Sequence, residues 1–265
     1  PSTNYGVEDD VGEIQEGGLY EARREAVYSH PDQTKNEVGL VSLNFQNFID
    51  DETQINGLIY SRYGRQKRLG GDVEAEFVTA ENEWEFEGEF NNSKTRQNGS
   101  GLGLNLSKIL DDHQITAGFT FDQSTVSYHA TETEDCEVNA IRKVICDDDS
   151  ETEDSAKVSG NSKTYSLFAS DTAEVADRIF VTGSLRYNHT KVSNTLSTPN
   201  EVTEKLEAQP KETFKYTKLN PAIGVSAKLD NGMNVFANAS QGNRVPTVIE
   251  LGCADRNNPC LLPTG

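Results

Sequence analysis

The sequence lacks any long hydrophobic run, and hydrophobic residues make up only 34% of it. Mean hydropathy is -0.64. No stretch reaches the roughly 18 consecutive apolar residues of a transmembrane helix, which excludes that class. Barrel strands stay compatible, because each needs only about 10 residues with alternate apolar side chains. Basic residues are also scarce, and the net charge of -19 argues against nucleic acid, whose phosphates need a cationic surface.

The patterns of a catalytic or metal centre are also lacking. The sequence has no Gly-x-Ser-x-Gly motif and no Cys/His pair suited to a nucleophilic site, so we expect no enzyme. The sequence contains no signal-peptide pattern and Pro1 begins within a loop-like stretch, so we expect targeting information to have been removed or never included. The histidines are scattered, without partners at metal-ligand spacing: His30, His113, His129 and His189.

The cysteines are few and fall into two local pairs in polar sequence, Cys136 with Cys146 and Cys253 with Cys260. Neither pair has the C-x-x-C spacing of zinc or thioredoxin sites, and no histidine lies nearby. Local pairs of this kind favour two disulfides and an oxidising compartment such as the periplasm or the cell surface. The alternative is four reduced, unrelated thiols.

Short runs of alternating apolar and polar residues dominate the chain. In Val38–Phe48, for example, Val41 and Leu43 point one way while Ser42 and Asn44 point the other. This period of two is typical of β-strands with different surroundings on their two faces. We expect strands at 38–48, 55–63, 100–107, 115–121, 163–170, 179–189, 213–229 and 233–241, with an extension at Trp84–Phe90 (WEFEGEF).

The connections between these strands alternate in length. Short turns are expected at 49–54, 110–114, 173–177 and 229–232, and long loops at about 65–98, 131–161, 193–212 and 243–265. Short turns at one end and long loops at the other indicate an outer-membrane barrel, with periplasmic turns and extracellular loops. A soluble β-sandwich also alternates apolar and polar residues, but it would not segregate loop length in this way. We therefore predict an all-β fold: an antiparallel transmembrane β-barrel segment of about eight strands.

The barrel interpretation assigns the two faces of the sheet. Val41, Leu43, Leu102, Phe119 and Val181 would face lipid, and the Asn, Ser, Thr, Arg and Gly side chains would face a wet lumen. Aromatic residues near strand ends fit an interfacial girdle, although aromatics capping a soluble core are the alternative. They are Tyr60, Tyr63, Tyr128, Tyr165, Tyr187, Phe214 and Tyr216.

The segment Lys218–Pro246 reads KLNPAIGVSAKLDNGMNVFANASQGNRVP. Its Asn-Pro-Ala-x-Gly strand, short turn and following Ser-x-Gly-x-Arg-x-Pro-Thr resemble the barrel of TonB-dependent outer-membrane receptors. The continuation ELGCADRNNPCLLP is similar to a branch of that family with a small disulfide loop at this place. Further similar pieces are LIYSRYGRQKRLGGD, HQITAGFTFDQSTVSY and YSLFASDTAEVADRIFVTGSLRYNHTKV.

The resemblance covers about residues 36–265 as a partial barrel of the 22-stranded type, and it is most specific over 213–260. Residues 1–35 match only as a polar extracellular loop. The resemblance implies a Gram-negative outer membrane and active uptake of a scarce nutrient, with a siderophore or other metal complex as the default ligand. The implied partners are lipid, a plug domain and TonB, and no cofactor is implied. The alternative is a passive barrel or a β-rich surface adhesin.

Three arginines are the candidate ligand contacts of the lumen or its mouth: Arg62, Arg186 and Arg244. The alternative, which we favour, is that they balance lumen carboxylates. Arg244, Pro246 and Glu250 would shape the strand into its loop, because proline ends the hydrogen-bonded ladder. Asp147, Asp148 and Asp149 offer oxygens that Ca²⁺ accepts, but without EF-hand spacing they favour a solvated loop.

Overall fold

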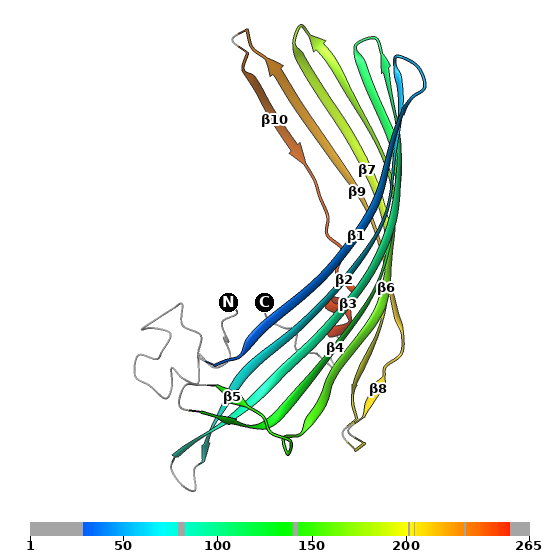
Figure 1. The fold of residues 1–265 in the computed structure, drawn as a ribbon. Coiled ribbons are helices and arrows are strands. Elements are labelled where there is room, and N and C mark those ends of the chain that lie inside the picture. The colour runs from blue at the N-terminus through cyan, green and yellow to red at the C-terminus, as the bar shows by residue number, and fades with distance from the viewer. Residues whose placement is uncertain are drawn as a thin grey trace.

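The computed structural model describes residues 29–78, 83–139, 143–200, 202–203, 205–230 and 232–254, and for 74–78 and 83–86 it describes the backbone alone. One curled antiparallel sheet runs in the order β1-β2-β3-β4-β6-β7-β9-β10, as Figure 1 shows. Its strands are β1 (Asp32–Phe48), β2 (Thr53–Val78), β3 (Glu83–Leu110), β4 (His113–Val138), β6 (Thr152–Ala176), β7 (Ile179–Pro199), β9 (Glu212–Lys228) and β10 (Asn234–Ser240).

Two short strands and a helix complete the described structure. β5 (Val144–Ile145) pairs with β4, β8 (Leu206–Ala208) pairs with β7, and α3 (Val248–Cys253) follows β10. Among the described residues, no helix is long and apolar enough to cross a membrane. The sheet does not close, since β1 and β10 lie at its two edges. The predicted fold class, an open antiparallel part of a barrel, is therefore confirmed.

The predicted short turns all lie at one end of the sheet, which we call the turn end. In the first turn the N–H of Ile49 donates to the carbonyl of Thr53 over 2.8 Å. The backbone N–H of Glu52 donates to Asp50 over 2.9 Å and lowers the pKa of that carboxyl. The other turns use left-handed residues, which permit a tight reversal: Asp111 (φ 51), Arg178 (φ 65) and Gly232 (φ 80).

The opposite, extended end differs from the prediction. The ranges expected as long loops, about 65–98, 131–161 and 193–212, are mostly strand where they are described. β2 and β3, for example, pair without interruption from Thr53↔Lys108 to Val78↔Glu83. The alternating pattern marks only the part of a strand that separates apolar from polar surroundings. Beyond it polar runs such as 65–68 and the glycines at 70–71 interrupt the pattern, while the backbone ladder continues.

The terminal ranges also differ in part. The expected loop 1–35 is described only from Ser29, and from Asp32 onward it is β1. Within 243–265, the described residues include α3 instead of loop alone.

The outer face of the sheet, which carries Leu43, Leu104 and Phe119, is apolar and exposed. The register aligns Leu43, Ile59, Leu102, Phe121 and Tyr165 in one row across five strands. Leu43 is 66% exposed and Leu167 is 59% exposed. So large an apolar surface would be a liability in water, but it suits a lipid environment. The predicted placing of Val41, Leu43, Leu102, Phe119 and Val181 on one face is confirmed by the register.

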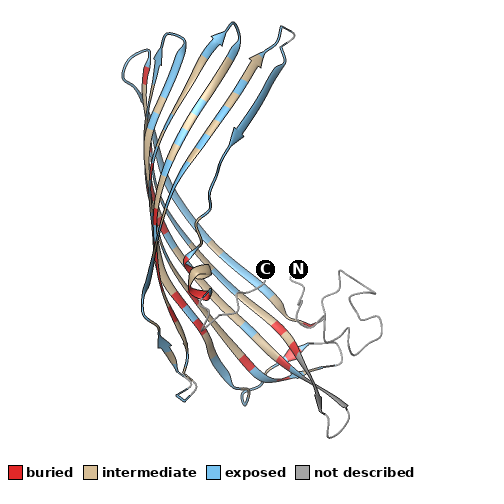
Figure 2. Ribbon diagram, turned by 180° about the vertical axis from the view of Figure 1, so that it is seen from behind, coloured by how far each residue is buried: buried red, intermediate tan, exposed pale blue. Residues whose placement is uncertain are grey.

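Buried side chains gather toward the extended end, where α3 and β5 lie (Figure 2). One cluster contains Val73, Cys136 and Val144. The predicted disulfide Cys136–Cys146 is present there, with a Cα–Cα distance of 4.4 Å, and it closes the loop that holds β5 against β4. Cys253 is also disulfide-bonded. Its predicted partner Cys260 lies outside the described residues, so that pairing stays a prediction.

Candidate functional site

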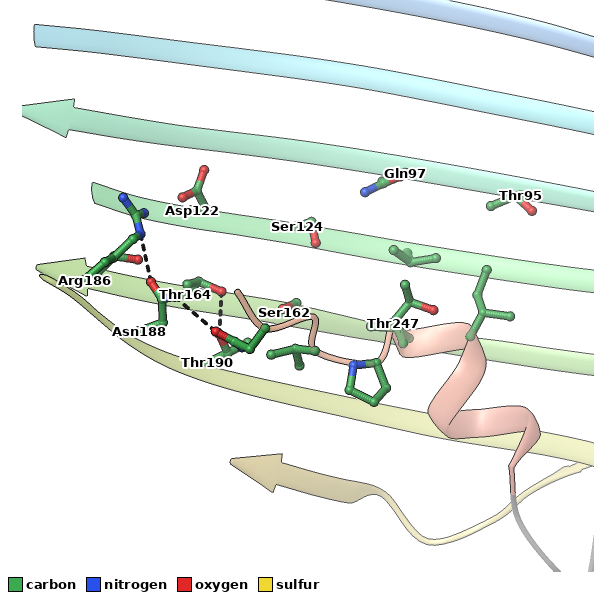
Figure 3. A pocket seen from close by; sticks show the side chains of 17 residues that line it. Thr95, Gln97, Asp122, Ser124, Ser162, Thr164, Arg186, Asn188, Thr190 and Thr247 are labelled. Atoms are coloured by element: carbon green, nitrogen blue, oxygen red, sulfur yellow. Dashed lines mark hydrogen bonds between the residues drawn. The ribbon is translucent and has the colours of Figure 1, made fainter. Parts of the chain in front are cut away.

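A polar cavity of about 470 Å³ lies on the inner face of the sheet, opposite the apolar outer face (Figure 3). Its walls are β3, β4, β6 and β7 on one side and Asn243 with Val245–Ile249 on the other. The sheet contributes mainly hydroxyl and amide side chains, together with one carboxylate and one guanidinium. They are Thr95, Gln97, Asp122, Ser124, Ser162, Thr164, Ser166, Arg186, Asn188 and Thr190. We call this space the inner cavity.

The second wall of the inner cavity belongs to residues 241–254, which we call the inner segment. After β10 ends at Ser240, the N–H of Gln241 donates to the carbonyl of Pro221 over 3.0 Å. The Asn243 side-chain oxygen then accepts from Asn220 over 2.8 Å. These bonds turn the chain away from the sheet edge and across the inner face, where Asn243 and Val245–Ile249 line the cavity.

The helix α3 anchors the inner segment. Thr247 caps it: the Thr247 hydroxyl accepts from the N–H of Glu250 over 3.2 Å, and Glu250 accepts from the N–H of Thr247 over 2.7 Å. Val248 and Cys253 are buried against Tyr128, Val158 and Val192 of the sheet. Burying a side chain such as Val248 contributes about 1.5–3 kcal/mol, so this contact holds the segment in place.

Two glycines permit the close approach of the inner segment. A Cβ at Gly160 of β6 would lie 2.0 Å from the backbone oxygen of Ser193 and 2.7 Å from a methyl group of Val248. A Cβ at Gly252 of α3 would lie 2.6 Å from a methyl group of Val158. Neither position has room for a side chain.

Of the three candidate arginines, the structure places Arg186 at the cavity. Its Nε donates to Asn188 over 3.0 Å and its Nη2 donates to Thr120 over 2.9 Å. The guanidinium carbon lies 5.6 Å from the centre of the Phe168 ring. These contacts fix the guanidinium on the wall. Asp122, the cavity carboxylate, accepts from the Tyr60 hydroxyl.

The other two arginines are placed differently. Arg244 pairs with Glu250, and the pKa of Glu250 is lowered by the backbone N–H of Thr247 and by this guanidinium. This pairing agrees with the interpretation that Arg244 shapes the segment after the strand. Arg62 lies over Gly99, where a Cβ would be 2.7 Å from its Nε. Neither Arg62 nor Arg244 lines the inner cavity, and ligand contact by any of the three stays a prediction.

Several cavity residues were not singled out from the sequence. They are Asp122, Ser166 and the hydrogen-bonded pair Thr164 and Thr190 (2.9 Å), which lie on the neighbouring strands β4, β6 and β7. The alternation of side chains predicts that these residues lie on the inner face. It does not predict that they lie beside the inner segment. The Ser166 hydroxyl is buried without a partner among the described residues, and such a group costs about 1–3 kcal/mol unless something pairs with it. The exposed hydroxyl and amide groups of the other wall residues favour a polar occupant.

The acidic loop offers less organised oxygens. Asp147 accepts from the N–H of Asp149 over 3.0 Å, within its own turn. In the described part of the chain, no group of three His, Cys, Asp or Glu side chains is arranged to hold a metal ion. Ca²⁺ binding at Asp147–Asp149 stays a prediction from the sequence.

Comparison with known proteins places the chain among receptors. A family model described as TonB dependent receptor-like, beta-barrel, matches residues 2–261. A search of curated proteins finds no match.

Solved structures agree with this fold. The ferric-catecholate import receptor Fiu from E. coli K12, in its open form, has a TM-score of 0.60 at 15% identity, over 81% of this chain and 37% of that one. The ferric yersiniabactin uptake receptor FyuA from Yersinia pestis has a TM-score of 0.57 at 13% identity, over 84% and 32%. The unliganded ferric citrate transporter FecA has a TM-score of 0.55 at 16% identity, over 83% and 29%. The chain thus spans roughly a third of these proteins.

Proposed function

The chain belongs to the TonB-dependent receptor family of outer-membrane β-barrels, and from this premise we propose that it forms part of the wall and lumen of a receptor that takes up a metal complex. Members of this family are receptors and transporters rather than enzymes. The observation that carries the proposal is the division between two faces of one sheet: an apolar, exposed outer face and a polar inner face with a cavity.

The proposed ligand is a siderophore or another iron complex. The support comes from the titles of three structures with the same fold, which name ferric-catecholate, ferric yersiniabactin and ferric citrate. Ferric complexes with catecholate or carboxylate donors are commonly anionic, and Arg186 offers the inner cavity a fixed positive charge. Two of its five N–H groups donate to Asn188 and Thr120, which leaves three for a ligand. Asp122 lies two residues from Thr120, to which Arg186 donates, and its carboxylate would disfavour complexes with a second anionic group at that place.

The proposed transport cycle uses this chain as wall and conduit. Loops and a plug domain would capture the complex, and TonB would transmit inner-membrane energy to displace the plug. Within this chain, the inner segment would narrow the lumen, and the hydroxyl and amide side chains of the inner cavity would exchange hydrogen bonds with a passing polar ligand.

A deletion strain tests the proposed function. Uptake of radioactive iron is measured with catecholate, hydroxamate and citrate chelators, in cells with and without this receptor and with and without TonB. We expect uptake of at least one complex to require both the receptor and TonB. Equal uptake of every complex in the deletion strain, or uptake that persists without TonB, would contradict the proposal.

Replacing Arg186 tests the role of the cavity guanidinium. Because a hydrogen bond to a charged group contributes about 1.5–3 kcal/mol, Arg186→Gln is expected to weaken receptor binding of the anionic iron complex about tenfold or more. Arg186→Lys, which keeps the charge, should lose less. The matched control is Arg178→Gln, which removes an arginine that pairs with Asp230 at the turn end. If the iron complex binds Arg186→Gln as tightly as it binds the control, Arg186 supports only the wall and not the ligand.

A further inference from the structure

A network of side-chain hydrogen bonds links the inner segment to the guanidinium of Arg186. The Asn243 side-chain oxygen accepts from the amide NH2 of Asn220 over 2.8 Å and from that of Asn188 over 3.5 Å. The Asn188 side-chain oxygen in turn accepts from the Nε of Arg186 over 3.0 Å, as Figure 3 shows. We call these four side chains the amide network.

The amide network joins parts of the chain that are far apart in the sequence. Asn243 lies in the inner segment, whereas Asn188 and Arg186 lie on β7. Arg186 then extends over β6 to β4, where its Nη2 donates to the Thr120 hydroxyl over 2.9 Å. The register accounts for this reach, because Asn188 pairs with Ser166 of β6 and Ser166 pairs with Thr120. The inner segment is therefore bonded to a side chain that itself holds the guanidinium.

Asn188 is the central member of the amide network, because both ends of its amide are used. Its oxygen faces a donor, the Nε of Arg186, and its NH2 group faces an acceptor, the Asn243 oxygen. If this amide were flipped, its NH2 group would face the Nε–H and its oxygen would face the Asn243 oxygen. Two attractive contacts would then become repulsive. The orientation of the Asn188 amide therefore depends on both neighbours.

The position of Asn243 is set by the docking of the inner segment. On one side, the N–H of Gln241 donates to the carbonyl of Pro221 over 3.0 Å. On the other side, α3 is held against the sheet by the buried side chain of Val248. Because Asn243 lies between these two anchors, its oxygen meets Asn188 only while the inner segment lies on the wall.

Three groups of the sheet hold the guanidinium of Arg186. They are the Asn188 oxygen, the Thr120 hydroxyl and the Phe168 ring, whose centre lies 5.6 Å from the guanidinium carbon. If Asn188 turned away, the guanidinium would keep only the other two contacts, and the direction of its remaining N–H groups would no longer be fixed. A ligand would then have to order this long side chain when it binds, which lowers affinity.

We propose that Asn243 and Asn188 are positioning residues, through which docking of the inner segment fixes the orientation of the Arg186 guanidinium. The inference rests on the proposed function in one respect, which is that Arg186 contacts an anionic iron complex. Coupling between two such events is reciprocal. An anion bound to the oriented guanidinium would therefore hold the inner segment more tightly on the wall.

The first test measures docking of the inner segment without a ligand. In the full-length receptor, Val248→Cys places a thiol at a buried position of α3, and its rate of reaction with a maleimide reports undocking. Compared with this parent, Asn243→Leu is expected to react about threefold to tenfold faster, the effect of losing a neutral hydrogen bond. Asn243→Asp keeps an acceptor oxygen and should react at the parent rate.

Two further variants complete the first test. Arg186→Gln should speed the reaction about twofold or more, although the contacts of this guanidinium described above are with the sheet. The matched control is Asn56→Leu, which removes an amide bond to Asn105 on the inner face of β2 and β3. This control should react as the parent does.

The second test measures binding of ferric citrate and of a ferric tris-catecholate to the same variants without the reporter cysteine. Asn243→Leu is expected to weaken binding of the recognised probe about threefold. Once Arg186→Gln is present, Asn243→Leu should have no further effect. A residue that acts through Arg186 produces this non-additivity, whereas a residue that only supports the wall would weaken both proteins equally.

Two results would overturn the inference. The first is that Asn243→Leu and Arg186→Gln react with maleimide at the same rate as Asn56→Leu. The second is that Asn243→Leu weakens binding equally with and without Arg186→Gln. Failure of the proposed function looks different: both variants would speed the maleimide reaction, but Arg186→Gln would bind both iron complexes as the native receptor does. That result would support the amide network and remove the ligand contact of Arg186.

Discussion

Leu104→Arg is expected to destabilise the barrel by about 2–4 kcal/mol and to reduce its amount in the outer membrane, because a charged residue on the lipid face must leave water. Leu104 lies on β3 between Leu102 and Leu106, in the apolar outer face, and is 45% exposed in the isolated sheet. The measurement is the urea unfolding midpoint of the receptor refolded into lipid vesicles, together with its level in outer-membrane fractions.

The neighbouring position provides the control for this substitution. Asn105 points to the inner face, where its side-chain oxygen accepts from Asn56 over 3.1 Å. Asn105→Arg introduces the same charge one residue away, on the lumen side, and should cost less than Leu104→Arg. If both variants lose the same stability, the outer face does not lie against lipid.

Gly160→Ala is expected to release the inner segment and to lower stability by about 1–3 kcal/mol, the usual cost of overpacking. The new methyl group would meet the backbone of Ser193 at 2.0 Å, and backbone cannot move aside as the end of a side chain can. The measurement is the rate at which protease cuts the inner segment in the folded receptor, together with the unfolding midpoint.

A second strand glycine separates this effect from the general loss of glycine. Gly183 on β7 has no atom within 4 Å of a built Cβ, so Gly183→Ala should leave both protease cleavage and the unfolding midpoint nearly unchanged. If Gly160→Ala and Gly183→Ala show the same cleavage rate and the same unfolding midpoint, the inner segment does not pack closely on β6.

The alternation of side chains explains why most strands were predictable. Leu43, Ile59 and Leu102 are separated by long stretches of sequence, yet each lies in a short alternating run, and the register brings them into one row. The turns were predictable for a related reason. Asp111 and Gly232 supply the left-handed conformations that a tight reversal needs, and both lie in polar stretches between alternating runs.

The length of the strands was not predictable in the same way. Between Arg65 and Asn98 the polar runs at 65–68 and 91–98 and the glycines at 70–71 interrupt the alternation, so the sequence pattern resembles that of a loop. The ladder persists because each backbone N–H and C=O finds a partner on the next strand, whatever the side chains are. Side-chain periodicity therefore reports the surroundings of a strand more directly than its extent.

The sequence predicts the polar character of the residues that line the inner cavity, but it does not predict where the cavity lies. Polar residues such as Ser124 and Thr164 follow from the alternation, and so does the inward direction of Arg186. Their meeting with Asn243 depends on the path of the inner segment, which is a tertiary feature. One local signal was available: Thr247 and Glu250 have the S/T-x-x-E spacing of a capping box, which marks the start of a helix.

The division into a lipid face and a lumen face is tested by the accessibility of single nitroxide labels placed in turn at residues 101–106 of the full-length receptor in membranes. We predict a period of two: labels at 102, 104 and 106 collide with oxygen dissolved in lipid, and labels at 101, 103 and 105 collide with a water-soluble nickel complex. Uniform accessibility along the segment, or the opposite phase, would contradict the assignment of an outer lipid face and an inner lumen.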